Sequence, residues 1–217
     1  KYLAFTEEGT APVAHLQKLA NAGMTHFHML PANDIASVDE NPANVVNIND
    51  TIGDLCRLNR NAAICEEEPE GTVIKDLLES YDPASEGGKA QALIDQMRGY
   101  DSFNWGYDPY HFNVPEGSYA SDAEGVQRIV EMRAMNMALH EIGLRVVLDV
   151  VYNHTNASGV YPRSVLDKVV PGYYHRYDVE TGAIVQETCC EDTEPRQAMM
   201  EKLMLDSLLL WTEQYKF

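Results

Sequence analysis

The stretch Val146-Val-Leu-Asp-Val-Val-Tyr-Asn-His-Thr155 decides the fold class of this chain. Its aliphatic run, interrupted only by Asp149, predicts a strand that is covered on both faces, as in a parallel sheet. Tyr152, Asn153 and His154 follow at the end of that strand. Polar side chains at the carboxyl ends of strands are where α/β folds usually place their chemistry, although a core strand with one hydrogen-bonded Asp would have the same pattern.

Three further segments have apolar residues at helical spacing, over 10–22, 122–143 and 195–215. The helix over 122–143 is predicted to bury an apolar stripe that includes Val126 and Val130. Helices thus precede and follow the central stretch, which is typical of an α/β fold.

The strands predicted from the sequence number three. Residues 25–31 form a short strand, and residues 110–154 predict a strand, a helix and a parallel strand, which together make a right-handed βαβ unit. Three strands are too few to close an eight-stranded barrel. The pattern therefore predicts either a small open α/β sheet or the first three strands of a (β/α)8 TIM barrel with their helices.

Residues 32–100 differ from the rest because they are rich in Asn, Asp, Glu and Pro. Two helical stretches lie near 51–60 and 87–98. A segment of this length between core elements predicts an insertion, over 35–100, with local structure of its own.

The charge of the chain excludes some partners. Its 34 acidic residues outnumber 16 basic ones, which gives a net charge of −18. Nucleic acids and anionic membranes are poor partners for such a chain, because phosphate binding requires clustered Lys and Arg. No stretch is long and apolar enough for a membrane span. The net negative charge is compatible with a well-solvated surface or with a neutral substrate such as a sugar.

Four cysteines occur, as Cys56, Cys65, Cys189 and Cys190. Cys56 and Cys65 enclose a short polar segment, so either a disulfide between them or free thiols fits the sequence. Adjacent cysteines such as Cys189 and Cys190 rarely bond each other, because disulfide geometry resists it. The spacings do not match a zinc site.

Aromatic residues are concentrated between Asp101 and Tyr119, among Gly, Pro, Asn and Asp. They are Phe103, Trp105, Tyr107, Tyr110, Phe112 and Tyr119. Aromatic rings stack on the CH faces of sugars while polar groups bond the hydroxyls, so this composition predicts a sugar-binding loop. A loop that plugs the end of a barrel is the structural alternative.

The strand stretch over 146–155 and the aromatic stretch over 101–119 support a family assignment. Val146–Thr155 resembles the first conserved region of the α-amylase clan of glycoside hydrolases, in which a strand ends in Asp-x-x-x-Asn-His. Asp101–Tyr119 resembles the Tyr-Asn-Trp-Gly-Tyr-Asp-Pro signature of type I pullulanases, with Phe103 in place of the first Tyr. The resemblance implies the N-terminal portion of a (β/α)8 catalytic barrel over 1–217, in an enzyme that hydrolyses α-1,6-glucosidic branch points of pullulan and related glucans.

The resemblance also implies roles for individual residues. His154 matches the histidine that hydrogen-bonds the sugar next to the scissile bond, and Tyr107 matches the tyrosine that stacks under that sugar. Asp108 and Trp105 belong to the same signature and are expected to bind substrate. Asp149 is expected to orient its neighbours rather than to react.

Asn153 completes the strand motif and is also expected to bind substrate. The matching residue is a calcium ligand in many amylases, so calcium is a candidate cofactor, although the chemistry itself requires none. Whether this chain uses any metal is left open.

The resemblance places the catalytic carboxyl groups outside these residues. Retaining glycosidases need a nucleophile and an acid/base, and in this family the nucleophilic Asp and the Glu acid/base follow the fourth and fifth strands. We therefore expect this chain to be inactive alone and to need the remainder of the same polypeptide. An extracellular or cell-surface location is expected from the likeness to bacterial pullulanases.

Two other functions also fit the sequence. One is another debranching enzyme of the clan, such as a limit dextrinase or isoamylase. The other is a non-catalytic module that binds α-glucans through the same substrate-facing residues.

Overall fold

The computed structural model describes residues 1–217, which form two units. The main unit comprises residues 1–37 and 105–217, and the inserted unit comprises residues 38–104. None of the helices in the chain has the length and apolar character that crossing a membrane requires.

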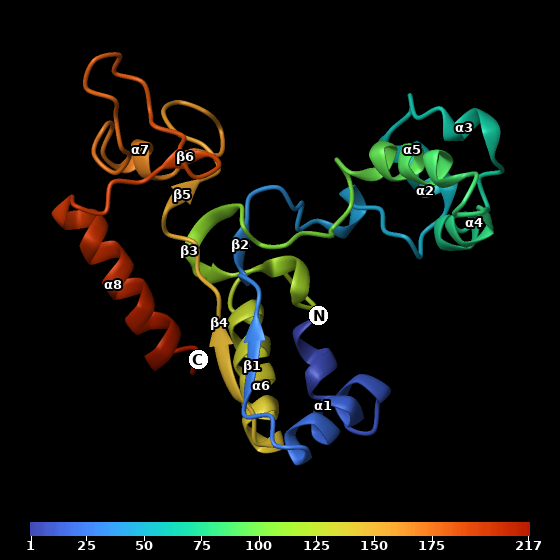
Figure 1. The fold of residues 1–217 in the computed structure, drawn as a ribbon, viewed down its shortest axis with the longest axis horizontal. Coiled ribbons are helices and arrows are strands. Elements are labelled where there is room, and N and C mark those ends of the chain that lie inside the picture. The colour runs from blue at the N-terminus through green and yellow to red at the C-terminus, as the bar shows by residue number, and fades with distance from the viewer. The chain divides into compact units, whose positions relative to one another are not determined.

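The main unit contains three sheets of two strands each. Strand β1 (His26–Met29) pairs in parallel with β4 (Arg145–Leu148), from His26 opposite Arg145 to Met29 opposite Leu148. Figure 1 shows these two arrows side by side and pointing the same way. Both strands were predicted from the sequence, but their pairing with each other was not.

The predicted βαβ unit over 110–154 is wrong in its pairing. Strand β3 (Pro109–Pro115), which precedes the crossover helix, pairs antiparallel with β2 (Asn33–Ile35) and not with β4. Strand β2 was not predicted because three residues are too few to show a periodic pattern. It also lies in a segment whose Asn and Asp content indicated the start of the insertion. The structure is thus of mixed α/β class, with one parallel pair instead of three strands of one sheet.

Strand β4 is also less covered than predicted. Val146 is buried, whereas Val147, on the opposite face, is 40% exposed. Successive side chains of a strand point to opposite faces, and the buried core of this unit contacts only the face that carries Val146.

Helix α6 (Gln127–Ile142) contributes Met132, Met135 and Leu139 to that core. The predicted stripe was partly wrong, because Val126 and Val130 are 71% and 55% exposed. The helix also begins later than predicted, after a turn in which Ser121 donates its backbone N–H and its hydroxyl to the buried Glu131 carboxylate.

The main unit has three further helices and two 3-10 turns. They are α1 (Ala11–Asn21), α7 (Leu166–Val169) and α8 (Ala198–Glu213), with 3-10 turns η1 (Tyr2–Phe5) and η3 (Gly117–Tyr119). Near the end of α8, the Trp211 indole donates to the Phe112 carbonyl at 3.0 Å and so attaches this helix to β3. Helices α1 and α8 lie close to their predicted bounds.

The inserted unit is helical and has its own core. Its elements are η2 (Pro42–Asn44), α2 (Ile52–Leu58), α3 (Ile64–Glu67), α4 (Ile74–Ser80) and α5 (Gly87–Met97). Residues Ile52, Leu55, Ile74 and Leu93 are buried together. Helices α2 and α5 were predicted. Helices α3 and α4 were not, because they are too short for apolar residues at helical spacing to be recognised in the sequence.

A disulfide joins Cys56 to Cys65 across the α2–α3 connection, so these two residues are not free thiols. The two cysteines are nine positions apart in sequence. A disulfide over this distance lowers the conformational entropy of the unfolded chain, which stabilises the folded state by about 2.5–3 kcal/mol. We expect the double variant Cys56→Ser/Cys65→Ser to lower the free energy of unfolding of the inserted unit by about this amount. Hydrogen exchange of peptides from 38–104 measures it, and unchanged protection there would contradict the prediction.

Candidate functional site

Polar side chains follow the carboxyl end of β4, as predicted. After Asp149 the chain enters β5 (His154–Thr155), which pairs antiparallel with β6 (Glu191–Asp192). Thr193 strengthens this attachment, because its N–H donates to the Asn153 carbonyl at 3.0 Å and its hydroxyl to the Tyr152 carbonyl at 2.6 Å. The backbone is therefore held by Thr193 just before His154 and by β6 at His154 and Thr155.

The imidazole of His154 is buried and bonded at both nitrogens. Nε2 lies 3.0 Å from the Tyr107 carbonyl oxygen, and Nδ1 lies 3.1 Å from the side-chain nitrogen of Asn153. A carbonyl only accepts, so Nε2 carries the proton and Nδ1 accepts from the Asn153 amide. This arrangement fixes the tautomer of the ring.

Tyr107 links His154 to Asp149. Besides its carbonyl contact with His154, Tyr107 donates its hydroxyl to Asp149 Oδ2. That hydrogen bond raises the pKa of Tyr107, because the carboxylate stabilises the protonated hydroxyl. The Asp149 N–H in turn donates to the Met29 carbonyl at 3.0 Å, at the end of β1. Asp149 thus holds the hydroxyl of Tyr107.

The other two predicted residues lie in the same loop but contact different partners. Asp108 accepts from the Asn156 side chain at 2.7 Å, and its carbonyl accepts from the Ala36 N–H at 2.8 Å. Trp105 is 62% exposed and Tyr107 is 42% exposed. Tyr107, Asp149, Asn153 and His154 therefore form one contact set, while Asp108 pairs with Asn156, which the sequence did not indicate.

Gly106 allows the loop to pass the end of β1. Its φ is +82°, and a Cβ placed there would lie 2.2 Å from the Pro31 carbonyl oxygen. Only glycine has both the required backbone conformation and the missing Cβ. The glycine of the Trp-Gly-Tyr-Asp sequence is therefore required at this position.

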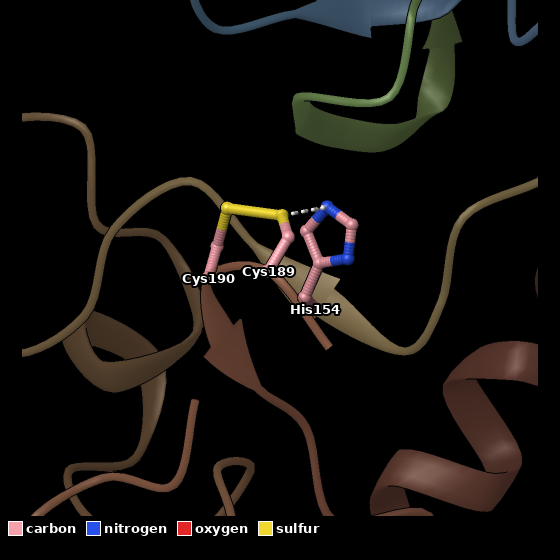
Figure 2. A group of neighbouring side chains, drawn as sticks. All are labelled: His154, Cys189 and Cys190. Carbon is pink, nitrogen blue, oxygen red and sulfur yellow. Dashed lines mark hydrogen bonds between the residues drawn. A yellow bond between two sulfur atoms is a disulfide. The ribbon is translucent and has the colours of Figure 1, made fainter. Parts of the chain in front are cut away.

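Sequence reasoning missed the sulfur atoms beside His154. Cys189 and Cys190 form a disulfide with each other, so the expectation that adjacent cysteines stay unbonded is wrong here. Figure 2 shows this pair against the imidazole, with Cys189 Sγ 3.6 Å from His154 Nε2. No local signal in the sequence placed the pair there, because the residues are 35 positions apart and are joined only by the fold.

A buried polar network centred on Asp167 contacts strand β5 through His175. Asp167 accepts from the backbone N–H groups of Gly159 at 2.6 Å and Gly172 at 3.1 Å. His175 Nδ1 lies 3.3 Å from the same carboxylate, too poorly aligned for a hydrogen bond, and His175 Nε2 lies 2.8 Å from the Thr155 hydroxyl. The network reaches Thr155, the neighbour of His154 on β5.

The donors around Asn153 do not suit calcium. Calcium takes six to eight oxygen ligands, whereas the groups next to Asn153 are the imidazole of His154 and, beyond it, two sulfur atoms. Nitrogen and sulfur are ligands for softer metals.

Comparison with known proteins identifies the family. Residues 35–103 match the family model of the Pullulanase Ins domain. Over its whole length the chain is 42% identical to a pullulanase of Klebsiella aerogenes, and over 99% of its length it is 43% identical to the chloroplastic pullulanase 1 of Arabidopsis thaliana. In both comparisons it covers 20% of the relative.

The structure supports the same assignment. It matches a crystal structure of Klebsiella pneumoniae pullulanase complexed with maltotriose, with a TM-score of 0.96 and 41% identity. The match covers 100% of this chain and 21% of that one. The chain therefore belongs to the pullulanase family and spans about a fifth of the length of these relatives.

Proposed function

We propose that this chain is the N-terminal portion of the catalytic (β/α)8 barrel of a debranching glycoside hydrolase, with its insertion over 35–100. The parallel strands β1 and β4 would be neighbouring strands of that barrel. The enzyme would cleave α-1,6-glucosidic bonds of pullulan and amylopectin with retention of configuration. The support is whole-length identity to pullulanases combined with a chain that spans a fifth of their length.

The observation that carries the proposal is the contact set of Tyr107, Asp149, Asn153 and His154 at the carboxyl ends of β1 and β4. Active sites of parallel α/β barrels lie at this end of the strands. The pullulanase of similar structure was solved with maltotriose, an α-glucan. We infer that this end of the chain binds an α-glucan.

In the proposed mechanism, these residues bind and orient the sugar while two carboxyl groups from the rest of the polypeptide react. The ring of Tyr107, held by Asp149, offers a face for stacking on a pyranose. The buried His154 would bond the sugar through a ring nitrogen that here contacts the Tyr107 carbonyl or the Asn153 amide. Asn153, Asp108 and Trp105 would complete the subsite. The nucleophilic Asp and the acid/base Glu flank the scissile bond. The chemistry requires no cofactor.

The location of the enzyme is also a proposal. Cys56–Cys65 is a disulfide, and disulfides persist chiefly in oxidising compartments. Together with the likeness to bacterial pullulanases, this favours an extracellular or cell-surface enzyme.

The test is pullulan hydrolysis, measured by release of reducing sugar. The 217-residue chain is compared with one extended through the next two strands of its polypeptide, and only the longer chain is expected to be active. His154→Ala in the longer chain should lower kcat/KM by about tenfold to a hundredfold, since losing the partner of a buried polar group costs about 1–3 kcal/mol.

The control is His15→Ala, which changes an exposed histidine on α1 and should leave hydrolysis unchanged. Activity in the 217-residue chain would overturn the assignment of the catalytic carboxyl groups. If both chains bind maltotriose without hydrolysing pullulan, the non-catalytic α-glucan-binding module replaces the enzyme.

A further inference from the structure

Three metal-ligating atoms meet beside the β5 strand. They are Nε2 of His154 and the Sγ atoms of Cys189 and Cys190, and all lie within 4.8 Å of one another. Figure 2 shows both sulfur atoms on the same side of the imidazole, with Nε2 as the ring atom that faces Cys189. The two cysteines are joined as a disulfide in this state.

The distance between the imidazole and the first sulfur fits a zinc site. In a tetrahedral site with Zn–S of about 2.3 Å and Zn–N of about 2.0–2.1 Å, sulfur and nitrogen ligands lie about 3.6 Å apart. Cys189 Sγ and His154 Nε2 are 3.6 Å apart. These two atoms are therefore already separated as two ligands of one ion would be.

Access to the disulfide differs between its two ends. Cys189 is exposed, Cys190 is half-buried and His154 is buried. Exposed disulfides are among the more readily reduced ones. After reduction, the buried imidazole would remain fixed while the exposed Cys189 side chain is open to a metal ion from solvent.

We propose that reduction of the Cys189–Cys190 disulfide creates a binding site for one thiophilic divalent cation of the zinc type, with both sulfur atoms and His154 Nε2 as ligands. Three protein ligands leave the fourth tetrahedral position to water, as in open zinc sites. Thiolate and imidazole ligands select zinc or cadmium over calcium and magnesium.

The reaction balances with a phosphine as the reductant. The phosphine gives two electrons to the S–S bond, which breaks, and water supplies the oxygen of the phosphine oxide and the two protons of the thiols. Binding of the cation then releases these two protons to solvent, because thiolate is the ligand form.

Metal binding changes the histidine contacts in a defined way. Nε2 must give up its proton and its bond to the Tyr107 carbonyl, and the proton must reside on Nδ1. Asn153 is exposed, so its amide can turn and accept from Nδ1 with its oxygen. His154 is then withdrawn from sugar binding, a consequence that rests on the proposed function, whereas the metal site itself does not.

The experiment is a titration of the 217-residue chain with Zn²⁺ by calorimetry and with Cd²⁺ by ultraviolet thiolate-to-cadmium absorption. Both are run on the oxidised chain and after reduction with a phosphine that is removed before titration. We expect one ion per reduced chain and none per oxidised chain. Binding to the oxidised chain, or no binding to the reduced one, overturns the proposal.

Variants assign the ligands. Cys189→Ser/Cys190→Ser should abolish metal binding. His154→Ala should weaken metal affinity by at least about tenfold, because even residues that only hydrogen-bond to metal ligands contribute that much. Cys56→Ser/Cys65→Ser and His15→Ala are the matched controls and should bind as the unchanged chain does. His154→Gln repeats the test if circular dichroism shows that His154→Ala is unfolded. Retained affinity in both histidine variants, or in Cys189→Ser/Cys190→Ser, overturns the ligand set.

Discussion

Gly106→Ala is expected to displace the aromatic loop and to remove most α-glucan binding. The new Cβ would lie 2.2 Å from the Pro31 carbonyl oxygen and 3.0 Å from its carbon, both of which are backbone atoms at the end of β1. Backbone cannot retreat as the end of a flexible side chain can, so the loop must move instead. The φ of +82° adds a conformational cost of about 1–3 kcal/mol for any L side chain.

The displacement would reach the site through the next residue. Tyr107 holds both His154, through its carbonyl, and Asp149, through its hydroxyl. A shift of an ångström breaks both hydrogen bonds, because neither tolerates such a lengthening. We therefore expect a loss of maltotriose affinity of more than about tenfold, which corresponds to 1.4 kcal/mol.

The matched control is Gly182→Ala, at a glycine with a φ of +68° and no atom near its missing Cβ. It carries the conformational cost, about 1–2 kcal/mol for a left-handed residue, without the clash. Calorimetric titration with maltotriose, in the chain extended through the next two strands, measures both variants. Equal affinity in Gly106→Ala and the unchanged chain would show that the loop is not positioned by this glycine.

The sequence predicted local features of the fold better than its pairings. Helices α1, α5 and α8 lie where apolar periodicity placed them, and the parallel strands β1 and β4 were both predicted. Periodicity reports which face of one element is apolar, but not which element covers it. Pairing of β3 with β2 depends on a three-residue strand far away in sequence, which leaves no periodic signal.

The same limit applies to the site. The motif residues Tyr107, Asp149, Asn153 and His154 do contact one another, and they were predicted as a group only from the resemblance of their motifs to one family. The disulfide of Cys189 and Cys190 was not predictable, because the average behaviour of adjacent cysteines is to remain unbonded. Such a contact depends on the conformation of one loop, which composition does not encode.

Asp167→Ala is expected to destabilise the main unit by about 3–6 kcal/mol, because it removes two backbone hydrogen bonds to a carboxylate, each worth about 1.5–3 kcal/mol. The carboxylate is buried, and the variant would leave two backbone N–H groups without an acceptor and the buried His175 without its facing charge. Because His175 contacts Thr155, the strand end that carries His154 should loosen as well.

Tryptophan fluorescence during urea unfolding measures this loss in the main unit alone. The chain has two tryptophans, Trp105 and Trp211, and both lie in that unit. The matched control is Asp206→Ala, which removes an exposed carboxylate paired with Lys202 on α8. Surface pairs of this kind contribute about 0–1 kcal/mol, so equal losses in the two variants would contradict the role of the buried network.

The acid dependence of stability gives a second readout for Asp167. Burial alone would raise the pKa of this carboxyl, but the N–H groups of Gly159 and Gly172 and the facing His175 outweigh it and hold the pKa below the ordinary value of 3.8. The unfolded chain therefore binds more protons in acid than the folded chain. The contribution of Asp167 is complete above the ordinary pKa and is lost as the pH falls through the lowered one. Asp167→Asn should be less stable than the unchanged chain at neutral pH, and the difference should shrink in acid; a constant difference would show that the carboxylate charge does not stabilise this network.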